Sequence, residues 1–377
     1  MTGPPRAIRA VNYRDPADGA AGLEWRELAP AEIVPTREAL AELALQPGLA
    51  DASAELEMRR RVPPSYQARA GDLLHIKDGW VETSMGTAIT SDHRYILDTV
   101  RTVRQAREYG YEKTAQFAFD VPDRDVVEVG GRALLVGLPA GGNYFHWMFE
   151  AVARWLLARD HVDADTRLLI PSVGSMERAA LAAAGAPEDR LMVMPASTLL
   201  RVEELVVAPR GIRMSDQIQP WAARALRALA PPAQVAQERL FISRSGAGRR
   251  RIANEPGVLE VLERHGFRAV HTEQLDVREQ IDLFARAEVI VGMHGAGLTN
   301  GVFAPGDATI VELQPPGLDI FRIDLYWNQA AASGQRYLQI VCPEAPDQGN
   351  TPQTERNIEV APAHLDAVLT RTLAARP

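Results

Sequence analysis

The segment Gly292–Asn300, with the sequence GMHGAGLTN, constrains the fold of this chain most, because it directly follows a run of β-branched residues. Glu288–Gly292 has the composition of a buried parallel strand, and Leu298 can begin a helix after a turn that contains Gly295 and Gly297. Glycines let the backbone approach a ligand, free N–H groups point outward, and the helix dipole favours negative charge. The segment therefore predicts an α/β unit with an anion-binding turn. An ordinary strand-to-helix turn is the alternative, because short glycine patterns recur by chance.

Composition limits the classes of protein to which the chain can belong. Its 377 residues suffice for two domains, and 46% apolar and 24% charged residues are typical of a globular protein. A net charge of −8 argues against a nucleic-acid partner, and the single cysteine, Cys342, excludes an intramolecular disulfide. Met1–Asp15 lacks the apolar core of a signal peptide, and no window approaches about 18 uninterrupted apolar residues. We therefore expect a cytoplasmic protein and leave peripheral contact with the inner membrane open.

The chain divides into three regions by pattern. Residues 1–130 are predicted to be a β-rich lead-in, within which 37–49 has the pattern of a helix. Strands alternate with helices in 131–232, which ends at a proline pair, and again in 233–377. Such alternation predicts two α/β domains, each with a parallel sheet covered by helices on both faces, and a cleft between the two.

Polar residues of the second domain gather where predicted strands end. Arg244 ends the first strand, Arg251 and Asn254 lie in the following loop, and His294 follows the central strand. Glu312 lies near the end of the next strand, where a carboxylate can accept hydrogen bonds from ribose hydroxyls. Ligands of doubly wound sheets bind beyond the carboxyl ends of the strands, and arginines recognise phosphates in a bidentate manner. The convergence predicts a nucleotide diphosphate site, although a solvated arginine run and a structural role for Glu312 are the alternatives.

A second cluster of polar residues lies in the first domain. Asn143 is a predicted N-cap, and His146, Glu150 and Arg154 follow at a spacing of four, so they share one helix face after the Gly-Gly loop at 141–142. A carboxylate one turn from a histidine fixes its tautomer and raises its basicity. The cluster predicts a general base. An incidental ion pair between Glu150 and Arg154 is the alternative.

Other chemistries have weak support in the sequence. The histidines are scattered without the spacing of a metal-ligand set, so we expect no metal and no cofactor. No Gly-x-x-x-x-Gly-Lys loop is present, which disfavours ATP hydrolysis. A dinucleotide-dependent oxidoreductase is also disfavoured, because Asn300 occupies the third glycine position of the Gly-x-Gly-x-x-Gly fingerprint.

Three motifs together resemble glycosyltransferase family 61 over about residues 130–315. They are Asn143–Glu150 (NYFHWMFE), Ile242–Arg244 with Arg251 and Asn254-Glu255, and Val291–Asn300 (VGMHGAGLTN). The resemblance implies an inverting, metal-independent hexosyl- or pentosyltransferase, with a UDP-sugar as the expected donor. It also implies a GT-B-like α/β fold of two Rossmann-type domains, in which residues 131–232 bind the acceptor and residues 233–377 bind the nucleotide sugar. Bacterial relatives are associated with capsule or lipopolysaccharide assembly, which implies a glycan or glycolipid acceptor.

The resemblance also implies roles for individual residues. His146 would be the general base, and Glu150 would orient it or act as the base itself. The donor would lie against a set of residues led by Asn143, Arg244 and Arg251. The remaining members of this set are Asn254, His294, Gly295, Ala296, Gly297, Leu298, Thr299 and Glu312. A catalytically inactive nucleotide-sugar-binding protein stays open as an alternative, as does the oligomeric state.

Overall fold

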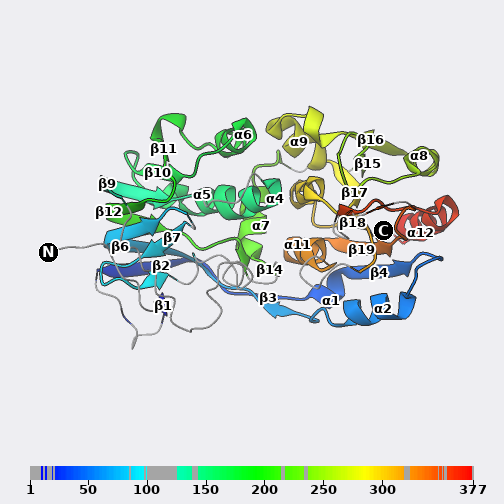
Figure 1. Ribbon diagram of the computed structural model, residues 1–377, viewed down its shortest axis with the longest axis horizontal. Coiled ribbons are helices and arrows are strands. Elements are labelled where there is room, and N and C mark those ends of the chain that lie inside the picture. The colour runs from blue at the N-terminus through cyan, green and yellow to red at the C-terminus, as the bar shows by residue number, and fades with distance from the viewer. Residues whose placement is uncertain are drawn as a thin grey trace. The chain divides into compact units, whose positions relative to one another are not determined.

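The computed structural model describes residues 10–11, 13–14, 19, 22–84, 86–96, 99, 125–137, 143–213, 217–232, 237–317, 323–346, 348–349, 351 and 355–375. The chain forms two compact units (Figure 1). Unit 1 comprises Met1–Glu32 and Arg69–Met214, and unit 2 comprises Ile33–Ala68 and Ser215–Pro377. The Gly141-Gly142 loop lies outside the described residues.

Unit 2 is built on a six-stranded sheet in which every neighbouring pair of strands is parallel. Its strands in spatial order are β16 (Phe267–Val270), β15 (Glu238–Ile242), β17 (Ala287–Met293), β18 (Thr309–Gln314), β19 (Arg336–Val341) and β4 (Leu40–Leu45). Because all six run the same way, their carboxyl ends meet at one edge of the sheet. The α/β class predicted from the sequence is confirmed.

Helices cover both faces of this sheet. The apolar side chains of one face, including Val291, Val311 and Leu338, pack with those of α8 (Glu255–Arg264) and α12 (Pro362–Ala374) in one buried core. The elements on the other side are the 3₁₀ helix η9 (Ala296–Phe303), α9 (Val277–Phe284) and α11 (Leu325–Ser333). Helix α9 begins with a capping box: the Asp276 side chain accepts from the Glu279 amide, and the Glu279 side chain accepts from the Asp276 amide.

The prediction of a helix over residues 37–49 is wrong. Only Thr36–Ala39 forms a helical turn, α1, and Leu40–Leu45 is the edge strand β4, which pairs with β19 in parallel. Leucine, alanine and glutamate favour helix by intrinsic propensity, but pairing with a distant strand overrides that preference. Figure 1 shows this blue strand beside β19, near the opposite end of the chain in sequence.

Unit 1 is built on a mixed sheet, and only part of it is parallel. β12 (Leu199–Val207), β9 (Val126–Leu135), β10 (Arg167–Ile170) and β11 (Leu191–Val193) are parallel neighbours. β6 (Gly71–Glu82) pairs with β12 in the antiparallel sense. Beyond β6 the sheet continues through β7 (Thr87–Ile89), β8 (Tyr95–Ile96) and β1 (Ala10–Val11). β2 (Leu23–Ala29) also pairs with β6. The lead-in therefore contributes central strands to unit 1, and residues 33–68 contribute to unit 2.

The division between the units also differs from the predicted boundary at residues 232–233, because the second unit starts near Ser215. Helix α7 (Pro220–Arg227) thus belongs to the later unit, where it packs against α11. The other short elements are β3 (Ile33–Val34), α2 (Ala52–Arg60), β5 (Tyr66–Gln67), α6 (Ser175–Ala183), β13 (Ile212–Arg213) and β14 (Gln217–Ile218). No helix in the described ranges has the length and apolar character needed to cross a bilayer.

Candidate functional site

The turn after β17 places two backbone N–H groups at the edge of the unit 2 sheet. His294 follows the strand, Gly295 turns the chain, and η9 begins at Ala296. Within the described part of the chain, the N–H groups of Ala296 and Gly297 donate to no acceptor, as expected for the first residues of a helix. Both residues are only half-buried, so this turn, which we call the donor turn (residues 294–300), can bind an anion through its amides.

Arg244 brings a guanidinium group to the same turn. It follows β15, the neighbour of β17, and its Nε donates to the Arg250 carbonyl at 2.9 Å and its Nη2 to the Arg249 carbonyl at 3.3 Å. A Cβ atom on Gly295 would lie 2.5 Å from Nη1 of Arg244, so only glycine lets the guanidinium lie this close to the backbone. Burial lowers the pKa of Arg244, while Tyr326 and Glu273 oppose that shift.

His294 is fixed by buried partners. Its Nδ1 lies 2.5 Å from Oε1 of Glu312, and the Tyr337 hydroxyl donates to Oε2 of the same carboxylate. The Tyr326 hydroxyl donates to the Gly295 carbonyl at 2.6 Å and its ring meets the His294 ring edge-on. Burial and the neighbouring Glu312 raise the pKa values of both tyrosines, which therefore stay protonated donors. The carboxylate of Glu312 is completely buried. This burial favours a structural role for Glu312 over the binding of ribose.

Several other residues predicted to bind the donor have different places in unit 2. The Asn254 side chain makes two hydrogen bonds to the backbone of Val360. Its Nδ2 donates to the Val360 carbonyl at 2.7 Å and its Oδ1 accepts from the Val360 amide at 3.0 Å, which holds the segment before α12 in place. Leu298 and Thr299, within the donor turn, have buried side chains. Arg251 exposes its side chain to solvent in the loop after Arg244, where it remains available to a ligand.

In unit 1, the predicted histidine–carboxylate pair is present. Asn143 caps the helix, its Oδ1 accepting from the Phe145 amide at 3.0 Å, and Nδ1 of His146 lies 3.2 Å from Oε1 of Glu150. Glu150 is buried, whereas the His146 side chain is 29% exposed and can reach a substrate. The same carboxylate oxygen also accepts from Nη2 of Arg210 at 2.6 Å.

The helix that carries this pair has an irregular centre. α4 (Tyr144–His146) passes into a π-helical turn, η4 (Trp147–Val152), and then into α5 (Ala153–Ala158). π-Helical turns are rare and are frequently found at functional sites. The predicted helix that carries His146, Glu150 and Arg154 is thus observed, but around Glu150 its backbone hydrogen bonds follow the π-helical pattern and not the α-helical one.

Arg154 is completely buried one turn beyond Glu150. Its Nε donates to the Pro209 carbonyl at 3.3 Å, and its Nη1 and Nη2 have no hydrogen-bond partner within the described ranges. Burial lowers its pKa to about 9, an effect that Glu150 opposes and Arg210 increases. The Arg154 guanidinium therefore depends on the Glu150 carboxylate for compensation of its charge.

Four residues around these two sites were not predicted from the sequence. Arg210 follows β12 after a proline, and Tyr326, Tyr337 and Arg59 come from elements outside the three motifs. One pattern in the sequence could have indicated buried polar side chains. Glu312 and Gln314 lie two positions apart in an apolar strand, so both side chains point to the same face of the sheet. Among the described residues, no group of three or more His, Cys, Asp or Glu side chains is placed to hold a metal ion.

Comparison with known proteins finds similarity in this region. Residues 144–311 match the model of a family described as Glycosyltransferase 61. An alpha-1,3-arabinosyltransferase of rice (Oryza sativa subsp. japonica), XAT3, is 40% identical over 96 residues, which is 24% of this chain and 16% of that protein. A second rice alpha-1,3-arabinosyltransferase, XAT2, is 38% identical over 106 residues, 26% of this chain and 18% of that protein. A rice beta-1,2-xylosyltransferase, XAX1, is 34% identical over 102 residues, which is 26% of this chain and 18% of that protein.

The chain spans less than a fifth of the length of these curated relatives. Among solved structures, the bacterial iron-containing dodecameric glycosyltransferase TibC from enterotoxigenic E. coli H10407 is 12% identical, with a TM-score of 0.34. That alignment covers 66% of this chain and 78% of that chain. A TM-score this low carries no argument about the fold or the site.

Proposed function

We propose that this chain, in which residues 144–311 match the model of glycosyltransferase family 61, transfers a sugar from a nucleotide-sugar donor to a hydroxyl group of a glycan acceptor. One observation carries the proposal: the Arg244 guanidinium lies against Gly295, next to the open amides of Ala296 and Gly297. A guanidinium and two amides at the carboxyl ends of adjacent parallel strands form a site suited to a diphosphate.

The donor in this proposal is a UDP-sugar. Its diphosphate binds Arg244 and the donor turn, and the exposed Arg251 approaches it from the loop. The printed names of the rice relatives support a pentose as the transferred sugar, with a hexose as the alternative. The proposed acceptor is a surface polysaccharide of the capsule or lipopolysaccharide type. This choice of acceptor rests on the resemblance alone.

The proposed reaction is a single displacement with inversion at the anomeric carbon. Nδ1 of His146 faces Glu150, which leaves Nε2 to take the proton from the acceptor hydroxyl. The acceptor oxygen forms the new bond to the anomeric carbon, and the bond to the diphosphate breaks with its electron pair on the leaving group. Arg244 and the two amides stabilise this departing charge without a metal.

A donor panel tests the proposal. We would incubate the purified chain with UDP-, GDP- and CMP-sugars and measure release of the free nucleotide, comparing it with Arg244→Ala, His146→Ala and the surface control Arg264→Ala. We expect one nucleotide class to be turned over by the wild type and the control, and both site variants to lose turnover. Turnover that persists in both site variants would contradict the proposal. Nucleotide binding without turnover would favour the inactive binding protein.

A further inference from the structure

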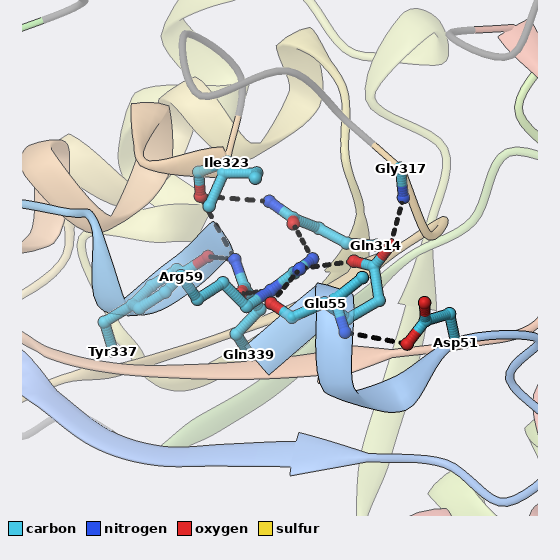
Figure 2. Close-up of polar contacts among 9 residues, drawn as sticks. Asp51, Glu55, Arg59, Gln314, Gly317, Ile323, Tyr337 and Gln339 are labelled. Carbon is cyan, nitrogen blue, oxygen red and sulfur yellow. Dashed lines mark hydrogen bonds and ion pairs between the residues drawn. The ribbon is translucent and has the colours of Figure 1, made fainter. Parts of the chain in front are cut away.

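Buried polar side chains link the donor turn to helix α2, which lies in unit 2 but outside the segment that matches the family. Figure 2 shows Arg59 of α2 placed between Glu55 on its own helix and two glutamines of the sheet. Its Nε donates to Oε1 of Gln339 at 2.5 Å, its Nη2 donates to Oε1 of Gln314 at 3.1 Å, and its Nη1 donates to the Glu55 carboxylate. Arg59 is 1% exposed, so it has left water entirely to make these contacts.

The hydrogen bonds continue from Gln339 to the donor turn. Nε2 of Gln339 donates to the Tyr337 hydroxyl at 2.9 Å, and Tyr337 donates to Oε2 of Glu312. Oε1 of Glu312 then meets Nδ1 of His294 at 2.5 Å. We call these five buried residues, Arg59, Gln339, Tyr337, Glu312 and His294, the buried relay.

The relay has a direction, because a guanidinium can only donate hydrogen bonds. Arg59 therefore fixes the amide of Gln339 with its oxygen toward α2 and its NH₂ group toward Tyr337. The Tyr337 oxygen accepts that bond, so its single proton points to Glu312. An ionised carboxylate accepts on both oxygens, which makes Nδ1 of His294 the donor and leaves Nε2 for a ligand.

Glu55 strengthens the connection between α2 and this edge of the sheet. Its Oε1 accepts from the Gly317 amide at 2.6 Å, while its Oε2 accepts from Arg59 (Figure 2). Gly317 follows β18, the strand that carries Glu312. The same helix thus holds both the relay and the chain that leaves β18.

We propose that Arg59 is a positioning residue that sets the tautomer and orientation of His294, and thereby the affinity of the donor turn for a nucleotide diphosphate. The affinity part rests on the proposed function, whereas the tautomer part does not. The competing explanation is that Arg59 only stabilises unit 2. The two explanations differ in what they predict for a mild variant at another residue of the relay.

The first experiment measures the tautomer of His294 by long-range ¹H–¹⁵N correlation of the imidazole rings of the full chain above neutral pH. The His294→Gln variant assigns the signal. We expect the wild type to carry a proton on Nδ1, and Arg59→Met and Tyr337→Phe to lose this single state. Leu369→Ala, a truncation in the opposite core, should keep it. A wild-type ring protonated only on Nε2, or a signal unchanged in both relay variants, would overturn the proposal.

The second experiment titrates the same proteins with UDP by calorimetry. We expect about 3- to 10-fold weaker binding for Arg59→Met and for Tyr337→Phe, and no further loss in the double variant, because both break one chain of bonds. Leu369→Ala should bind as the wild type does. If Arg59→Met does not fold, Tyr337→Phe carries the test, since it removes a single hydroxyl group.

The outcomes separate the two proposals. Unchanged UDP affinity in relay variants that have lost the tautomer would overturn the link to the ligand. A wild type that binds no nucleotide contradicts the proposed function, while the tautomer measurement still decides whether Arg59 positions His294.

Discussion

Replacing Gly295 with alanine should separate ligand binding from folding in unit 2. The backbone of Gly295 has a φ of 166°, which is extended and open to any residue, so alanine introduces no backbone strain. The new Cβ would lie 2.5 Å from Nη1 and 3.2 Å from Cζ of Arg244. These atoms are the end of a flexible side chain, so the guanidinium moves away while the sheet stays intact.

The magnitude follows from the contact that is lost. A hydrogen bond to a charged group contributes about 1.5–3 kcal/mol, so we expect nucleotide affinity to fall about 10- to 150-fold. The free energy of unfolding should change by no more than about 1 kcal/mol. Calorimetric titration and urea unfolding measure the two quantities on the same protein.

The loop after Arg244 offers a matched control for this substitution. A Cβ on Gly248 would meet nothing within 4 Å, so Gly248→Ala should leave both affinity and stability unchanged. Equal nucleotide affinity for Gly295→Ala and Gly248→Ala would refute the placement of the diphosphate against Arg244. A large loss of stability in Gly295→Ala would refute the claim that only the side chain moves.

Three further predictions concern single residues. His146→Ala should lower kcat about 10²- to 10⁴-fold and leave nucleotide affinity intact, and steady-state kinetics with an unchanged kcat would remove His146 from the mechanism. Glu150→Gln should lower the free energy of unfolding by about 3–5 kcal/mol in urea titrations, because the buried Arg154 and its neighbour Arg210 lose their carboxylate; a loss below about 1 kcal/mol would contradict that charge balance. Asn254→Ala should lower the free energy of unfolding by about 1–3 kcal/mol, because the bonds to Val360 are lost, and should leave nucleotide affinity unchanged. Weaker nucleotide binding at unchanged stability would instead support the predicted role of Asn254 in binding the ligand.

Much of the unit 2 fold could be predicted because its elements carry local signals. The capping box at Asp276 and Glu279 marks the start of α9, and β-branched runs mark β17 and β18. The strand Leu40–Leu45 could not be predicted, because its residues favour helix and only β19, about 300 residues away, makes them a strand.

The candidate sites show the same limit. A spacing of four predicted the contact between His146 and Glu150, since helical periodicity alone brings them together. Arg210 reaches Glu150 from the end of β12, and no local pattern encodes that approach. Glu312 is near the predicted place, but its burial against His294 and Tyr337 depends on how β17, β18 and β19 align in the sheet.

Binding of a nucleoside diphosphate by the donor turn is the central claim, and calorimetric titration of the wild type with UDP, GDP, CMP and NAD, with and without EDTA, tests it most directly. We expect that one nucleotide, UDP, binds with an affinity that EDTA does not change and that Gly295→Ala weakens. Binding of NAD alone, or of any nucleotide only in the presence of a metal, would contradict it.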